Sequence, residues 1–180
     1  FNMGIPLLPI HILWINLVSE TFPALALSLD PAAKDVMSKS PRGKGKQFMD
    51  RGMIWRISYQ GIMVAGITLA AFVIGKSFGG ETLGQTMAFA SLIAAKLVHA
   101  GNLHSNTESR FRFNVMDNKP LIFALMMSLL FSLAVLLITP FRNAFEFASM
   151  TPGQWGIVLL LSLVPLIVVE VFKALGWNGK

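Results

Sequence analysis

The sequence predicts an all-α protein, a polytopic membrane bundle of five transmembrane helices, and three observations carry that prediction. Of the 180 residues, 54% are hydrophobic and only 13% are charged, and the mean hydropathy is +0.62. One water-soluble core of this size would not bury so much apolar surface. Five apolar stretches are each long enough to cross a hydrocarbon core, which takes about 20 helical residues. The apolar–polar alternation of a membrane β-barrel is absent, so helices must pair the backbone groups in lipid.

The predicted spans form a single domain over residues 1–180, and the lipid bilayer is expected to surround it. Each gap between apolar stretches contains charge, Gly or Pro, which interrupt apolar helices. In chain order the five spans are approximately 8–29, 53–74, 83–104, 121–139 and 153–172.

The distribution of positive charge predicts the orientation. Twelve of the fifteen Lys and Arg residues lie within 30–56, 105–119 and 173–180, which share one side of the membrane if five helices alternate. Lys and Arg are enriched in cytosolic loops, so we expect these basic loops in the cytosol of a multi-pass protein of the cell (plasma) membrane. Because the basic residues are split among short loops, no nucleic-acid partner is expected.

Two connections have a character of their own. Residues 41–46, PRGKGK, combine Pro, Gly and positive charge. They predict an extended, solvated loop that either sets topology or docks on anionic headgroups or an acidic protein surface. The connection at 140–152 carries Phe141, Phe145 and Phe147, which favours an interfacial segment.

Polar side chains interrupt the first apolar stretch. Asn16 and Glu20 are four residues apart and share a helical face, with Ser19 beside them. An amide, a hydroxyl and a carboxylate are the hard oxygen donors that calcium, magnesium or sodium prefer. Pro23 lacks an N–H and should free a carbonyl about one turn back as a further ligand. The alternative is a structural, protonated Glu20 with interhelical hydrogen bonds from Asn16 and Ser19.

The third stretch carries Lys96, His99 and Asn102 at spacings of three, on one face. Lys96 lies too deep to reach the headgroups easily, so Glu20 is a plausible partner. An ammonium cannot ligate a cation, but it can replace the charge of one. His99 and His104 lie on different faces without cysteine or a nearby carboxylate, which favours packing over a transition-metal site.

The rest of the chain offers no reaction chemistry. Glu170 and Lys173 fit a solvated pair near the cytosolic end of the fifth stretch. The chain has no cysteine, no Gly-rich phosphate loop and no Ser/His/Asp arrangement, so we expect no catalytic residue. It opens on Phe1 without a signal peptide and reads as a piece of a longer protein.

Several of these segments resemble calcium-transporting P-type ATPases of the bacterial type. Residues 4–20, which end in WINLVSE, and residues 22–27 look like the sixth transmembrane helix of that family, and Asp30-Pro31 matches its end. Residues 40–42 and 51–53 look like the basic loop between helices six and seven, and residues 87–105 look like helix eight. The resemblance covers essentially the whole chain and implies helices six to ten, the C-terminal membrane domain.

The resemblance implies site residues and a cargo. Asn16, Ser19 and Glu20 match the helix-six calcium ligands, although the family has Thr and Asp where this chain has Ser19 and Glu20. Thr21 stands where the family often has Gly, so local unwinding is less favoured. Lys96 falls where the two-site pump has a helix-eight glutamate, which implies one divalent ion per cycle with Lys96 as a tethered counter-charge.

The resemblance also implies what must lie outside this chain. ATP and Mg²⁺ would act on cytosolic domains that, with helices one to five, precede Phe1 in the parent pump, so this piece alone would not be catalytic. The parent would be an ATP-driven cation efflux pump, with Ca²⁺ favoured as its cargo. Two alternatives stay open: a secondary cation or proton-coupled transporter, and a structural membrane scaffold with Glu20 and Lys96 as a buried ion pair.

Overall fold

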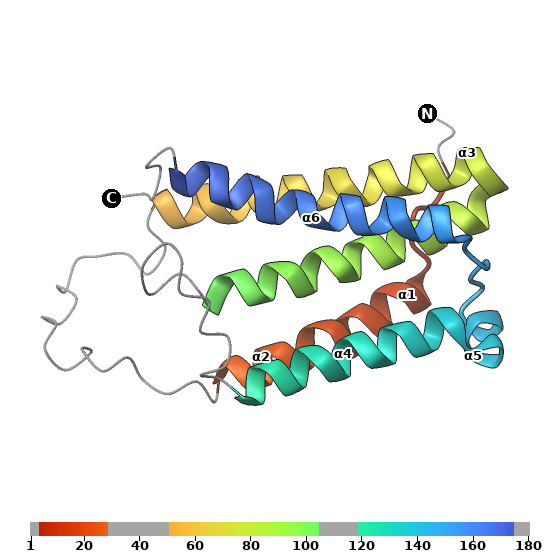
Figure 1. Cartoon of the computed structure of the whole chain (residues 1–180), viewed down its shortest axis with the longest axis horizontal. Helices are drawn as coiled ribbons and strands as arrows, with labels where there is room; N and C mark the ends of the chain where they lie inside the picture. Colours follow the sequence, from red (N-terminus) through yellow and green to blue (C-terminus); the bar gives the residue numbers. More distant parts are fainter. Residues whose placement is uncertain (1–3, 29–50, 105–118, 175–180) are drawn as a thin grey trace, which may run out of the picture.

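The structure is a computed structural model that describes residues 4–28, 51–104 and 119–174, and every regular element in those ranges is helical (Figure 1). This confirms the predicted all-α bundle. The elements are α1 (Pro9–Trp14), the π-helical turn η1 (Ile15–Glu20), α2 (Thr21–Ser28), α3 (Arg51–His104), α4 (Lys119–Leu137), α5 (Thr139–Ala144) and α6 (Pro152–Ala174). The elements α1, η1 and α2 follow one another directly and are together called the first helical segment.

Prolines mark where helices begin. Pro9 and Pro152 are the first residues of α1 and α6, and Pro140 lies in the first turn of α5. The first turn of a helix has no partner for its N–H groups, so a residue without an N–H costs nothing there. These residues therefore set the helix starts at one end of the bundle, which also holds α5 and is called the α5 end (Figure 1).

The gap expected between the second and third apolar stretches is almost entirely helical. In α3 only Gly79 (φ −157°, ψ 25°) and Gly80 (φ 81°, ψ −171°) leave helical geometry, and the chain reverses there into two arms (Figure 1). The gap between the predicted second and third spans, 75–82, is therefore reduced to a two-residue reversal, because glycine adopts the positive φ that Gly80 has at no steric cost.

The two arms of α3 approach each other backbone to backbone near that turn. A Cβ added to Gly75 would lie 2.8 Å from the Cα of Gly84, and one added to Gly84 would lie 2.7 Å from the Phe72 carbonyl oxygen. Small residues permit such close packing of membrane helices, where lipid competes with every apolar contact. The arms therefore form a tight hairpin.

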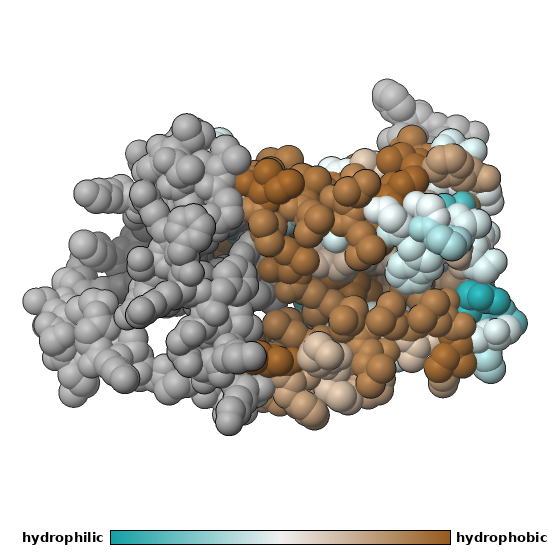
Figure 2. Space-filling view, viewed as in Figure 1, coloured by the Kyte–Doolittle hydropathy of each residue, from teal (hydrophilic) through white to brown (hydrophobic). Residues whose placement is uncertain are grey.

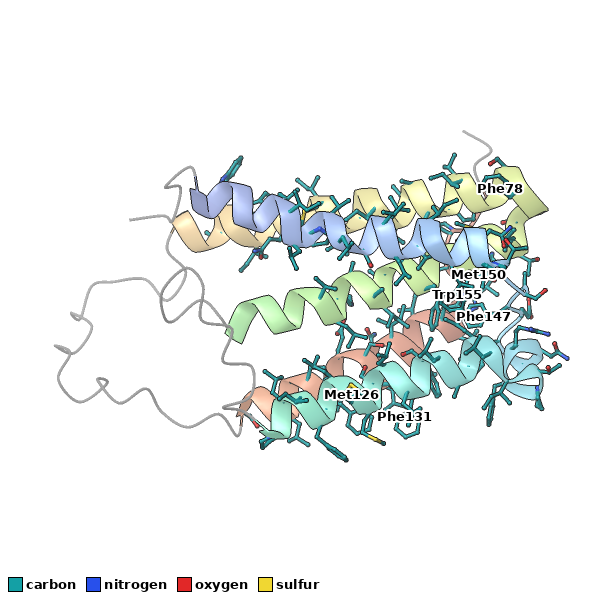
Figure 3. All side chains as sticks on the ribbon, viewed as in Figure 1. Phe78, Met126, Phe131, Phe147, Met150 and Trp155 are labelled. Atoms are coloured by element: carbon teal, nitrogen blue, oxygen red, sulfur yellow. The ribbon has the colours of Figure 1, made fainter. Side chains whose placement is uncertain are left out.

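The first helical segment lies between α4 and the second arm of α3, and α6 lies along α3 (Figure 1). The core joins these elements through large apolar side chains that include Ile15, Met87, Phe89, Val135 and Val158. Figure 3 shows Phe147, Met150 and Trp155 gathered near the start of α6, where they contact this core. The first helical segment is thus packed against fixed neighbours along its length.

Large apolar side chains cover the outside of the bundle. Ile62 in α3, Phe123 in α4 and Leu160 in α6 are 74%, 68% and 69% exposed. Figure 2 shows apolar residues over the middle of the described helices and polar residues at the α5 end. Such a surface is stable in lipid and not in water.

Among the described residues, two helical segments, Ile57–Val98 and Pro120–Leu137, are long and apolar enough to cross a membrane, and Pro152–Val168 is a shorter apolar stretch. The first of these includes most of both arms of α3. The membrane helix bundle is therefore confirmed as a class, while the five individual spans and their orientation stay predictions. The basic loop at 41–46 lies outside the described residues.

Candidate functional site

A carboxylate and an ammonium meet between the first helical segment and the second arm of α3. The Lys96 Nζ donates to Glu20 Oε1, which makes the pair that the sequence suggested. The Lys96 side chain is 31% exposed and that of Glu20 is 50% exposed. A charged residue at the centre of a bilayer costs roughly 3 kcal/mol on insertion scales, and pairing offsets part of that cost. Half of the Glu20 side chain is therefore not covered by the described residues.

The turn that carries Glu20 is wider than an α-helix. η1 spans the six residues Ile15–Glu20, which include Asn16, Ser19 and Glu20. π-helical turns are rare and often mark functional sites. The helix widens before Pro23 and continues through that residue as α2.

The three candidate donors do not share one surface. The side chains of Asn16 and Glu20 are exposed, whereas Ser19 is buried at 4% exposure. The Ser19 hydroxyl has no hydrogen-bond partner among the described residues. A buried hydroxyl without a partner costs about 1–3 kcal/mol, so such groups in native proteins need an explanation.

The backbone oxygens of the widened turn have polar neighbours. The Thr21 hydroxyl donates to the Asn16 carbonyl at 2.9 Å, and the Ser128 hydroxyl of α4 donates to the Val18 carbonyl at 3.3 Å. In the i to i+5 pattern of a π-turn, the partner of Val18 would be Pro23, which has no N–H. Pro23 therefore cannot donate to this carbonyl, and the Ser128 hydroxyl does. That the carbonyl serves as a cation ligand stays a prediction.

For the remaining polar candidates of the third stretch, the structure describes the backbone and not the side chains. His99 and Asn102 lie in α3, and their side chains are outside the described part of the structure, as is that of His104. Within residues 4–28, 51–104 and 119–174 no group of three or more His, Asp or Glu side chains is arranged to hold a metal ion.

One buried polar residue was missed from the sequence. His11 has no exposed surface, and its ring stacks on Phe147 at 4.4 Å between centroids. Phe147 was expected at the membrane interface, but it is 5% exposed and packs in the core. The sequence did contain a signal, because a histidine within an apolar stretch needs a hydrogen-bond partner. That partner is the carbonyl of Phe145, 134 residues away.

An all-α bundle with an apolar outer surface and a carboxylate–ammonium pair between its helices is typical of integral membrane proteins. The chain is a member of the family described as cation transporting ATPase, C-terminus, whose model matches residues 4–175.

Its relatives carry consistent names. The chain is 38% identical to calcium-transporting ATPase 1 of Bacillus cereus, over 93% of this chain and 21% of that protein. It is 36% identical to the calcium-transporting ATPase of Bacillus subtilis, over 93% of this chain and 19% of that protein. It is 27% identical to the calcium-transporting ATPase type 2C member 2 of Mus musculus, over 96% of this chain and 18% of that protein. The chain therefore spans about a fifth of the length of these relatives.

Proposed function

We propose that this chain is the ion-binding and anchoring membrane part of an ATP-driven calcium efflux pump of the plasma membrane, with its basic loops in the cytosol. The observation that carries the proposal is the half-open Glu20 carboxylate on a widened helical turn, paired with Lys96. The names of the relatives favour calcium as the cargo. ATP hydrolysis with Mg²⁺ would take place in other domains of the same pump.

The ligands from this chain are Asn16, Ser19 and Glu20. Calcium takes six to eight oxygens at about 2.3–2.6 Å and accepts amide, hydroxyl and carboxylate donors together. The unpartnered Ser19 hydroxyl supports this assignment, since a cation or its water would satisfy it. Three donors are too few, so the remaining ligands come from the preceding membrane helices of the pump.

Lys96 acts as the counter-charge of Glu20. Before the cation arrives, the ammonium neutralises the carboxylate, and when the cation binds, the ammonium moves away from it. A lysine ammonium is a donor only and repels a second divalent ion. One divalent cation is therefore transported per cycle.

Substitution at Glu20 tests the site in the complete pump. Glu20→Gln keeps the shape of the side chain and removes its charge, so we expect it to abolish cation-dependent phosphorylation by ATP. Lys96→Glu replaces an ammonium that repels cations with a carboxylate that can ligate them. It should therefore raise the cation affinity or the number of cations transported per cycle. Unchanged transport by the Glu20→Gln pump would remove the site assignment.

Two other functions are compatible with an intramembrane Glu–Lys pair. A secondary cation or proton-coupled transporter would also use one. An upstream Asp-Lys-Thr-Gly-Thr phosphorylation motif in the same reading frame separates a pump from that alternative. A structural scaffold would tolerate apolar replacement of both Glu20 and Lys96 without loss of transport.

A further inference from the structure

His11 is fully buried at the α5 end, and both of its ring nitrogens make hydrogen bonds. The backbone N–H of Leu8 donates to Nδ1 at 3.2 Å, and Nε2 lies 2.8 Å from the carbonyl oxygen of Phe145. Because Nδ1 accepts, the imidazole is neutral and its proton is on Nε2, which donates to Phe145. The ring also contacts Phe89 and Phe147, at 5.6 and 4.4 Å between centroids. His11 thus joins the first helical segment to α3 and to the segment that follows α5.

The segment after α5 has a conformation suited to this contact. Glu146 has a φ of 56°, which non-glycine residues adopt infrequently. Glu146 lies between Phe145, whose carbonyl oxygen accepts from His11, and Phe147, whose ring stacks on His11. Two residues further, the N–H of Ala148 donates to the Thr86 hydroxyl in α3 at 2.9 Å. The segment is therefore held from two directions, by the first helical segment and by α3.

A second attachment fixes the same end of the first helical segment. The N–H of Ile5 donates to Glu81 Oε1 at 3.0 Å, and the Gln85 amide donates to the Ile5 carbonyl at 2.9 Å. The sequence separation of Ile5 and Glu81 is 76, and that of Glu20 and Lys96 is also 76. The chain that leads into α1 is therefore attached to the start of the second arm at the α5 end, and the ion pair joins the first helical segment to the same arm further along.

We propose that His11 is a positioning residue that fixes the height of Glu20 opposite Lys96. This inference rests on the proposed function, because it concerns the same site. A helix advances about 1.5 Å per residue, so a shift of one residue at the α5 end would move the carboxylate by more than an ion pair or a calcium ligand tolerates. The hydrogen bond from Nε2 of His11 to the Phe145 carbonyl is directional and opposes such a shift, whereas apolar packing alone would permit it. The local bond from the Leu8 N–H to Nδ1 fixes the tautomer that makes this donation possible.

The test compares three variants of the complete pump. His11→Phe keeps an aromatic ring and removes both hydrogen bonds, and His11→Gln keeps a donor and an acceptor. Phe72→Leu, in the first arm of α3, is the control for a buried change away from the first helical segment, since Phe72 is 1% exposed. The measured quantities are the calcium concentration for half-maximal ATPase activity and the maximal rate.

We expect His11→Phe to raise the half-activating calcium concentration by about tenfold or more, since calcium takes its oxygen ligands within the narrow range of about 2.3–2.6 Å. The maximal rate should change by less than about twofold, because the defect is in binding. His11→Gln should restore most of the affinity, and Phe72→Leu should leave it unchanged.

Equal half-activating concentrations for His11→Phe and the unmodified pump would overturn the proposal, and so would an equal loss in Phe72→Leu. If His11→Phe does not fold, Thr86→Val is used in its place, because it removes the hydroxyl that accepts from the Ala148 N–H. This variant should also raise the half-activating calcium concentration. An unchanged concentration would overturn the proposal. Failure of the proposed function is distinguishable, because Glu20→Gln would then leave calcium dependence intact whatever His11 does.

Discussion

Replacement of Lys96 by methionine tests the counter-charge directly. Methionine keeps most of the length and the apolar stem of lysine, so the change removes mainly the ammonium that contacts Glu20. In the proposed cycle calcium must displace this ammonium from the carboxylate. Loss of the ammonium removes that competition, so the Lys96→Met pump should bind calcium more tightly.

The structure bounds the size of this effect. Two unit charges about 4 Å apart attract by roughly 4 kcal/mol at an effective dielectric constant of about 20. Fully exposed pairs contribute only about 0–1 kcal/mol. Glu20 and Lys96 are 50% and 31% exposed, which places the pair between these limits. About 1.4 kcal/mol is a tenfold change in affinity, so the half-activating calcium concentration should fall by roughly tenfold.

The assay is calcium-dependent ATPase activity of the complete pump over a range of calcium concentrations. Lys76→Met is the matched control, because Lys76 lies on α3 near the arm reversal, 5.9 Å from the Phe72 ring centroid and away from Glu20. It should change the half-activating concentration by less than about twofold. An unchanged or raised concentration in Lys96→Met would refute the idea that the ammonium competes with calcium.

Two further substitutions test the widened turn and the helix hairpin. Thr21→Val removes the hydroxyl that donates to the Asn16 carbonyl and should alter calcium affinity by about three- to tenfold, near the 1 kcal/mol of one hydrogen bond, while Thr21→Ser should not. Equal affinities for the Val and Ser variants would contradict a role for that bond. Gly84→Ala places a methyl group 2.7 Å from the Phe72 carbonyl and should lower stability by about 1–3 kcal/mol in a thermal unfolding assay. Gly66→Ala, where a Cβ meets nothing within 4 Å, should not, and equal melting temperatures would argue against the tight hairpin.

Features set by local composition could be predicted from the sequence. The apolar stretches predict helices, because a segment of about 20 apolar residues in lipid has few other ways to pair its backbone N–H and C=O groups. The Glu20–Lys96 pair followed from charge alone, since each residue lies where an unpaired charge is expensive. The sidedness of the loops and the ligand roles of Asn16, Ser19 and Glu20 stay predictions.

Features that depend on distant segments could not be predicted. His11 acquires its partner from Phe145, and no local pattern links two residues 134 positions apart. The widened turn η1 also could not be predicted, because residues 10–27 are mostly apolar and a rotation of the later residues leaves no mark in such a pattern. The predicted spans leave a gap at 75–82, whereas the chain reverses within Gly79–Gly80, since polar residues and glycines mark a break between spans without fixing its length.

The most direct test of the central claim is the number of calcium ions bound per phosphorylated pump, measured with radioactive calcium and phosphate in the unmodified protein. With Lys96 beside Glu20, the ratio should be one. A ratio of two would contradict the account, because a second divalent ion would then share a site that we assign to the lysine ammonium.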